Sequence, residues 1–172
     1  MKRIFLLLWL ATGLLQTTTA QQTTEVQEGA TTYFLIRHAE KDRSDPSNKN
    51  PGLTKKGFFR ADRWADLFSS TELDAIYSTD YDRTLMTASP TARKKELEIQ
   101  LYDPSKLFSE EFQQATAGKT VLVVGHSNTT PAMVNAMIGE NKYADMDDND
   151  NGTLFVVTLM DGKSEVQILK LN

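Results

Sequence analysis

Residues 32–36 read TYFLI and run directly into Arg37 and His38. A continuous run of apolar and β-prone residues is typical of a strand that is buried on both faces, as strands are in a parallel sheet. Thr54 follows a polar segment and can cap a helix over residues 54–68, whose apolar side chains recur at helical spacing. The first strand and helix therefore predict an α/β fold.

The same alternation of strand and helix continues along the chain. Strands are expected at 32–36, 75–77, 97–102 and 120–124, and helices at 54–68, 81–95, 105–116 and 129–138. This alternation implies a parallel sheet with helices on both faces. The apolar runs 154–159 and 166–171 flank Asp161-Gly162, which is a hairpin signal. We predict a three-layer α/β/α domain over residues 31–172, with a mostly parallel sheet ending in an antiparallel hairpin.

The first twenty residues have the pattern of a targeting segment. Lys2 and Arg3 precede an apolar stretch at 4–15, and Ala20 ends a run of small residues. This pattern predicts a secretory signal peptide cleaved after Ala20, followed by a flexible leader at 21–30. We expect a secreted or periplasmic protein without stable membrane association after cleavage. An uncleaved anchor is the alternative, although about 20 apolar residues are needed for a comfortable span.

The charge and the residue counts exclude several functions. Cleavage would leave 17 basic residues against 23 acidic ones, a net charge of −6, which argues against a nucleic-acid partner. The chain has no cysteine and two histidines, so thiol catalysis and metal centres with three imidazoles are excluded. A metal site with one or two histidines plus carboxylates stays open on these counts alone. We expect no cofactor and no metal.

Both histidines of the chain follow short apolar strands. His38 comes after residues 32–36, and His126 comes after residues 120–124. The carboxyl ends of parallel strands form the ligand-binding edge of such a sheet. Arg37 lies beside the first histidine, and Arg83 lies at the start of a helix that begins on the same edge. Taken singly, each residue could be a capping or solvated side chain, but together they predict an anion pocket with a titratable nucleophile.

These residues stand in motifs that resemble the histidine phosphatase (phosphoglycerate-mutase-like) superfamily, in a short branch without a lid. The motifs are Leu35-Ile36-Arg37-His38-Ala39-Glu40, Leu53-Thr54-Lys55-Lys56-Gly57, Ser78-Thr79-Asp80-Tyr81-Asp82-Arg83-Thr84 and Val123-Val124-Gly125-His126-Ser127-Asn128. The resemblance covers residues 31–171.

The resemblance implies a covalent mechanism. His38 would attack phosphorus and carry the phosphoryl group, Arg37 and Arg83 would bind its oxygens, and His126 would stabilise the charge of the transition state. Thr54, Ser127 and Asn128 are expected to contact the substrate.

The general acid is not located by these motifs. His126 is followed by Ser127 rather than by the aspartate of the phytase and acid-phosphatase branch, and the interval after Arg83 lacks the insertion that carries the acid in mutases. Asp103 and Glu40 are the candidates, because one ends a strand on the active edge and the other follows the nucleophile. The alternatives are a turn with Pro104 for Asp103, and an ion pair with Lys41 for Glu40.

Two further patterns are weaker. Asp147, Asn149, Asn151 and Gly152 match the first half of a calcium loop, but Thr158 stands where a bidentate carboxylate is needed. A solvated acidic loop is the better interpretation. Glycan acceptor patterns begin at Asn128 and Asn151, and a glycan on the first would block the pocket.

The sequence therefore predicts a phosphatase that hydrolyses phosphomonoesters or phosphohistidine through a phosphohistidine on His38. The expected partners are a phosphorylated small molecule or a phosphoprotein. Two alternatives stay open: a non-catalytic module that binds phosphorylated ligands in the same pocket, and a phosphotransferase of the phosphoglycerate mutase type. The motifs do not name the natural substrate.

Overall fold

The computed structural model describes residues 29–171. The signal peptide expected at residues 1–20, and all but the end of the expected leader, lie outside the described residues. The sheet has the strand order β3-β2-β4-β1-β5-β6. Its strands are β1 (Thr31–Arg37), β2 (Ala75–Ser78), β3 (Ile99–Leu101), β4 (Thr120–Gly125), β5 (Thr153–Met160) and β6 (Lys163–Lys170).

The sheet is parallel at one side and antiparallel at the other. Strand β1 pairs in parallel with β4, and β2 pairs in parallel with both β4 and β3. Strand β5 runs antiparallel to β1 and forms a hairpin with β6 through Asp161 and Gly162. This arrangement confirms the predicted mostly parallel sheet with a terminal antiparallel hairpin.

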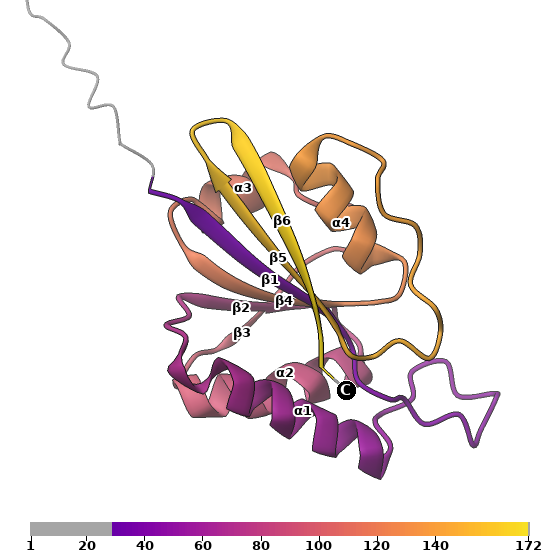
Figure 1. The fold of residues 1–172 in the computed structure, drawn as a ribbon. Helices are drawn as coiled ribbons and strands as arrows, with labels where there is room; N and C mark the ends of the chain where they lie inside the picture. The colour runs from indigo at the N-terminus through magenta and orange to yellow at the C-terminus, as the bar shows by residue number, and fades with distance from the viewer. Residues whose placement is uncertain (1–28, 172) are drawn as a thin grey trace, which may run out of the picture.

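Helices cover both faces of the sheet. Figure 1 shows α1 (Lys55–Leu67) and α2 (Asp82–Lys95) on one face, and α3 (Glu110–Thr116) and α4 (Thr129–Ile138) on the other. A short 3-10 turn, η1 (Phe68–Ser70), extends α1. The three layers are those expected from the alternation of strands and helices in the sequence.

Alternate side chains of the central strands fill two separate cores. Tyr33 of β1 and Val121 of β4 pack on the side of α3 and α4, together with Phe112. Ile36 of β1 and Leu122 of β4 lie on the opposite face, where they belong to a cluster with Trp64 of α1 and with residues of α2. Because both faces of β1 and β4 are buried, the middle of each strand is apolar. Each large side chain buried there contributes about 1.5–3 kcal/mol.

The third helix is shorter than the sequence suggests. A helix was expected from residue 105, but α3 begins at Glu110. Residues 103–109 form turns instead: the Asp103 carboxylate accepts hydrogen bonds from Ser105, and Phe108 has a φ of 51°. Ser109 then caps the helix by accepting from the amide of Phe112. Local side-chain to backbone bonds of this kind compete with helix formation.

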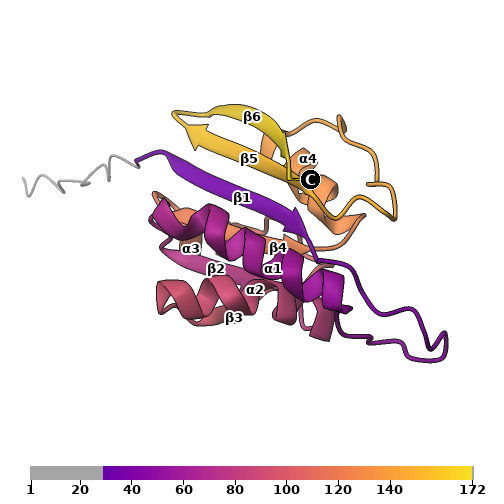
Figure 2. The ribbon, with the colours of Figure 1, turned by 60° about the horizontal axis from the view of Figure 1, so that its bottom comes forward.

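Two long loops extend from the same end of the sheet. One joins β1 to α1, and the other joins α4 to β5; Figures 1 and 2 show both at the end where β1 finishes. The first loop is held close to α1, since the amide of Thr54 donates to the carbonyl of Glu40. A side chain at Gly57 would collide with that same carbonyl, so glycine is required there. These loops form the rim of the candidate active site.

Candidate active site

The two histidines meet because their strands are neighbours. In the β1–β4 pairing, Arg37 lies opposite Gly125, so the residues that follow, His38 and His126, leave the sheet side by side. The amide of His38 donates to the carbonyl of Gly125 at 2.9 Å, and the two imidazole centroids are 5.5 Å apart. Strand order also reverses around this pair, and that is where open α/β sheets bind ligands.

A cavity of about 480 Å³ opens above these histidines. Both predicted arginines line it, and the rest of its wall comes from the two rim loops, from the segment between β3 and α3, and from the starts of α2 and α4. The lining residues are Arg37, His38, Lys41, Tyr81, Arg83, Pro104, Ser105, His126, Ser127, Asn128, Thr129 and Asp148. The cavity thus combines three cationic side chains, two histidines and one carboxylate.

The hydrogen bonds of His38 fix its tautomer. Nδ1 lies 2.7 Å from the carbonyl oxygen of Ala39, which can only accept, so Nδ1 carries the proton and donates. Nε2 is then the unprotonated nitrogen with a free lone pair. The backbone around the ring is held as well: the amide of Ala39 donates to Thr87, and Asn151 donates to the carbonyl of His38. The imidazole is therefore oriented with a nucleophilic nitrogen available.

His38 is also held neutral. Its side chain is 3 % exposed, and burial lowers its pKa to about 3. The hydrogen bond to Ala39 opposes this shift, whereas the charges of Arg37, Arg83 and His126 reinforce it. Burial is the larger cause, and the neighbouring positive charges add to it. At neutral pH the ring is uncharged.

His126 is oriented by a chain of hydroxyl groups. Thr84 donates to backbone carbonyls and accepts from Thr79, so the Thr79 hydroxyl accepts from Nε2 of His126 at 2.9 Å. This leaves Nδ1 of His126 facing Arg83. Burial, Arg83 and Arg37 lower the pKa of His126 to about 4 in the empty pocket. A bound phosphoryl dianion would favour the charged ring and reverse this shift.

Arg83 has unused donors. Its guanidinium lies over the ring of Tyr81, with Cζ 4.4 Å from the centroid, and Nη2 approaches Nδ1 of His126 at 3.5 Å. Nε and Nη1 are buried and lack a hydrogen-bond partner among the described residues. Buried donors without partners cost free energy, so their presence at a cavity of this charge indicates a ligand with several acceptor oxygens.

Arg37 is almost fully buried, with 2 % of its surface exposed. Its Nη1 donates to the carbonyl of Asp147 at 2.8 Å, and its Nη2 donates to the carboxylate of Asp148 at 2.7 Å. Nε is buried and has no partner in the described part of the chain. The structure thus brings Arg37, His38, Arg83 and His126 to one cavity.

Of the other predicted site residues, some line the cavity and some do not. Ser127 and Asn128 line the cavity, but Thr54 lies outside the lining and caps α1, where its hydroxyl accepts from the amide of Gly57. Neither candidate acid lines the cavity. The Asp103 carboxylate is exposed and caps Ser105, in the turn that was the alternative for it.

Glu40 is held in an ion pair, but the partner is not Lys41. Its carboxylate accepts from Nε and Nη2 of Arg60, and Lys56 lies 3.3 Å away. Arg60 and Lys56 lower its pKa, against the effect of burial. A carboxylate kept ionised by a bidentate arginine is a poor proton donor. The proton donor must therefore be sought among other groups.

Sequence reasoning missed several residues of the site. Lys41, Tyr81 and Asp148 line the cavity, and Thr79 orients His126. Lys41 and Tyr81 stand within the quoted motifs or next to them, so their positions in the sequence were a usable signal. Asp148 stands 22 residues after His126, in a loop whose course depends on tertiary contacts.

The calcium-like loop encloses Arg37. Asp147 and Asp150 accept from this guanidinium through their carbonyl oxygens, and Asp148 accepts through its carboxylate. Across residues 29–171, no group of three or more histidine, cysteine, aspartate or glutamate side chains is placed to hold a metal ion. The glycan acceptor Asn151 is 6 % exposed.

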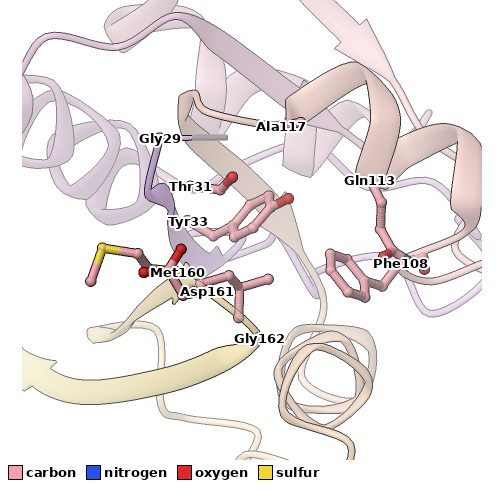
Figure 3. Close-up of a pocket in the computed structure, with 10 residues that line it drawn as sticks. Gly29, Thr31, Tyr33, Phe108, Gln113, Ala117, Met160, Asp161 and Gly162 are labelled. Atoms are coloured by element: carbon pink, nitrogen blue, oxygen red, sulfur yellow. Dashed lines mark hydrogen bonds between the residues drawn. The ribbon is translucent and has the colours of Figure 1, made fainter. Parts of the chain in front are cut away.

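A second cavity, of about 140 Å³, lies at the opposite end of the sheet (Figure 3). Tyr33, Phe108 and Met160 line it, and its charged lining residue is Asp161. It lacks the cationic and nucleophilic groups of the first cavity. Of the helices described, none has the length and apolar character that crossing a bilayer requires.

The three-layer fold and the cavity with two histidines and two arginines agree with the resemblance to the histidine phosphatase superfamily, and so does comparison with known proteins. A family model of the histidine phosphatase superfamily (branch 1) matches residues 33–104, the part of the chain that carries Arg37, His38 and Arg83. The resemblance predicted from the sequence is thereby confirmed. No curated protein sequence matches the chain.

Solved structures show the same fold. The candidate phosphohistidine phosphatase SixA from Agrobacterium tumefaciens is 24% identical with a TM-score of 0.63, over 83% of this chain and 99% of that one. The protein histidine phosphatase SixA complexed with tungstate is 14% identical, with a TM-score of 0.63 over 81% and 96% of the chains. A phosphoglycerate mutase from Bacillus anthracis is 14% identical, with a TM-score of 0.63 over 83% and 94%.

Proposed function

We propose that this protein is a phosphatase that acts through a phosphohistidine on His38. In the first half-reaction Nε2 attacks phosphorus, the bond to the leaving group breaks, and the leaving group takes up a proton. In the second, water attacks phosphorus, the N–P bond breaks, and inorganic phosphate leaves. The match to a model of the histidine phosphatase superfamily supports a phosphatase-type activity, and the residues of the cavity support this route to it.

The observation that carries the proposal is the state of His38. Its Nδ1–H is committed to the Ala39 carbonyl, and its pKa of about 3 keeps Nε2 unprotonated at any pH near neutrality. An oriented, neutral imidazole beside unsatisfied arginine donors is what nucleophilic attack on a phosphoryl group needs. The donors of Arg83 and Arg37 would bind the phosphoryl oxygens, and a protonated His126 would stabilise the charge of the transition state.

The substrate is proposed to be a phosphomonoester or a phosphohistidine. Both kinds of substrate fit a cavity of about 480 Å³ whose lining includes Arg37, Arg83 and Lys41. Aryl phosphates and phosphohistidine have leaving groups that depart with little help from a proton donor. The position of Asp103 and Glu40 outside the cavity favours such substrates over alkyl phosphates.

That same observation favours one alternative, a module that binds phosphorylated ligands without turnover. The two proposals predict different results with an aryl phosphate and the mature chain. The phosphatase releases phosphate with multiple turnovers, and His38→Ala abolishes this release while inorganic phosphate still binds. Stoichiometric binding of inorganic phosphate without any hydrolysis would support the binding module instead.

We also propose that the chain is exported and cleaved after Ala20. The support is the basic start, the apolar stretch and the small residues before the expected cleavage position. Intact-mass measurement of exported protein should give a chain that begins at Gln21. A retained Met1 on exported, active protein would contradict this.

A further inference from the structure

The guanidinium of Arg37 is held from one side by the loop between α4 and β5. Nη1 donates to the carbonyl of Asp147 at 2.8 Å and approaches the carbonyl of Asp150 at 3.4 Å. Nη2 donates to Oδ1 of Asp148 at 2.7 Å. Three acceptors from four consecutive residues thus engage the two terminal nitrogens.

These contacts leave a defined part of the guanidinium unused. A guanidinium has five N–H donors in a fixed plane, and the acceptors of the loop take up the two on Nη1 and one on Nη2. Nε–H remains, buried and without a partner in the described chain, together with the second donor of Nη2. Two donors on adjacent nitrogens of arginine bind two oxygens of a phosphoryl group as a fork.

We propose that residues 147–150 position Arg37, and that the Asp148 side chain sets the plane of its guanidinium so that the Nε edge faces the substrate. Asp148 is a positioning residue in this proposal, because it acts on the phosphoryl group through Arg37. The inference rests on the proposed phosphate-binding function of the site.

The loop is itself held by hydrogen bonds to the start of β5 and to the backbone of His38. The Asp150 carboxylate accepts from the amide and the hydroxyl of Thr153 at the start of β5. Asn151 donates to the carbonyl of His38 at 2.9 Å. The acceptors of Arg37 are therefore fixed relative to the nucleophile, and arginine and histidine keep their mutual geometry.

This role also explains the calcium-like spacing of the loop. Loops that bind cations turn carbonyl and carboxylate oxygens inward, and here the enclosed cation is a guanidinium. The second oxygen of Asp148 accepts from Arg43 at 2.6 Å, so the carboxylate spans two arginines and keeps a fixed orientation. The 61 % exposure of the Asp148 side chain makes a purely structural role in the core untenable.

Asp148 lines the cavity, so its carboxylate could instead compete with the phosphoryl group for Arg37. Removing the carboxylate would then tighten phosphate binding, whereas loss of a positioning contact would weaken it. The two roles therefore predict changes of opposite sign in phosphate affinity. Asp148→Asn and Asp148→Ala both remove the charge, but only asparagine keeps an acceptor oxygen for Arg37.

The test measures binding of inorganic phosphate to the mature protein by calorimetry, with thermal unfolding as the check on folding. Asp148→Ala should bind phosphate about three- to tenfold more weakly than Asp148→Asn, as expected for one hydrogen bond of ordinary strength to a neutral acceptor. The value of kcat/KM for an aryl phosphate should fall by the same factor. Asp145→Ala removes a charge from an exposed aspartate of the same loop and should stay within about twofold of the unaltered chain.

Equal phosphate affinity in the two Asp148 variants would overturn the inference, and so would tighter binding in both. An unaltered chain that binds no phosphate would overturn the proposed function and the inference with it. If alanine at 148 prevents folding, Asp148→Ser shortens the side chain and retains a hydroxyl, and it should also bind phosphate more weakly than Asp148→Asn. Equal binding by the serine and asparagine variants would then contradict the proposal.

Discussion

Replacing Arg83 by lysine separates the geometry of the arginine from its charge. In the structure Nε and Nη1 of Arg83 are buried without partners, and the guanidinium is held in place over Tyr81. A phosphoryl group in the cavity can therefore accept from more than one nitrogen of this side chain. Lysine keeps the positive charge but offers one compact ammonium group on a flexible stem.

The expected loss follows from the hydrogen bonds that lysine cannot make. Charge-assisted hydrogen bonds contribute about 1.5–3 kcal/mol, so we expect transition-state binding to weaken by about 2–3 kcal/mol. This loss corresponds to a fall in kcat/KM of roughly 30- to 160-fold. Without ligand, the substitution breaks no hydrogen bond of Nε or Nη1, so the free energy of unfolding should fall far less than transition-state binding does.

The assay compares kcat/KM for an aryl phosphate between the unaltered chain, Arg83→Lys and Arg93→Lys. Arg93 is an exposed residue in the last turn of the same helix, so it controls for the exchange of arginine for lysine on α2. The control should retain full activity. Near-normal activity of Arg83→Lys would show that Arg83 does not bind the phosphoryl group, and the reasoning from its unpartnered donors would be refuted.

Three further predictions concern pH, the general acid and metals. The pKa of His38 is about 3 in the folded chain and about 6.5 in the unfolded chain, so between these pH values only the unfolded chain binds the proton. The contribution of His38 to the free energy of unfolding should therefore fall by about 1.4 kcal/mol per pH unit as the pH drops through this window. Urea unfolding at pH 7 and pH 5 should show a smaller difference for His38→Asn than for the unaltered chain, and an equal difference would contradict the buried neutral ring. Asp103→Asn should leave kcat for an alkyl phosphate unchanged, since the Asp103 carboxylate caps Ser105 and does not line the cavity; a loss of tenfold or more would restore it as the acid. Activity should survive excess chelator, because Arg37, Arg83 and Lys41 supply the positive charge at the cavity, and recovery of lost activity by calcium would contradict this.

The meeting of the two histidines could be predicted because it depends on strand order alone. Each histidine directly follows an apolar strand, and parallel neighbours place their carboxyl ends together. The capping of α1 by Thr54 was likewise readable, since the cap and its acceptor geometry are local. For Asp103, the sequence offered a turn as the alternative to an acid, and the structure places it in that turn.

The contribution of the loop between α4 and β5 could not be predicted. Its acceptors reach Arg37 across more than 100 residues of sequence, and their direction is set by contacts of Asp150 and Asn151 that no local pattern encodes. The same spacing of aspartate and asparagine fits a calcium loop or a solvated turn. The partner of Glu40 was missed for a similar reason, because Arg60 reaches it from the following helix rather than from the adjacent residue.

The central claim is that His38 carries the phosphoryl group between two half-reactions. The direct measurement is rapid alkaline quenching of the mature protein during turnover of a labelled substrate, since a phosphoramidate survives base and breaks down in acid. The account predicts label on a peptide that contains His38, and none in His38→Ala. Label on the peptide that contains His126, or full turnover without label in the His38→Ala variant, would contradict it.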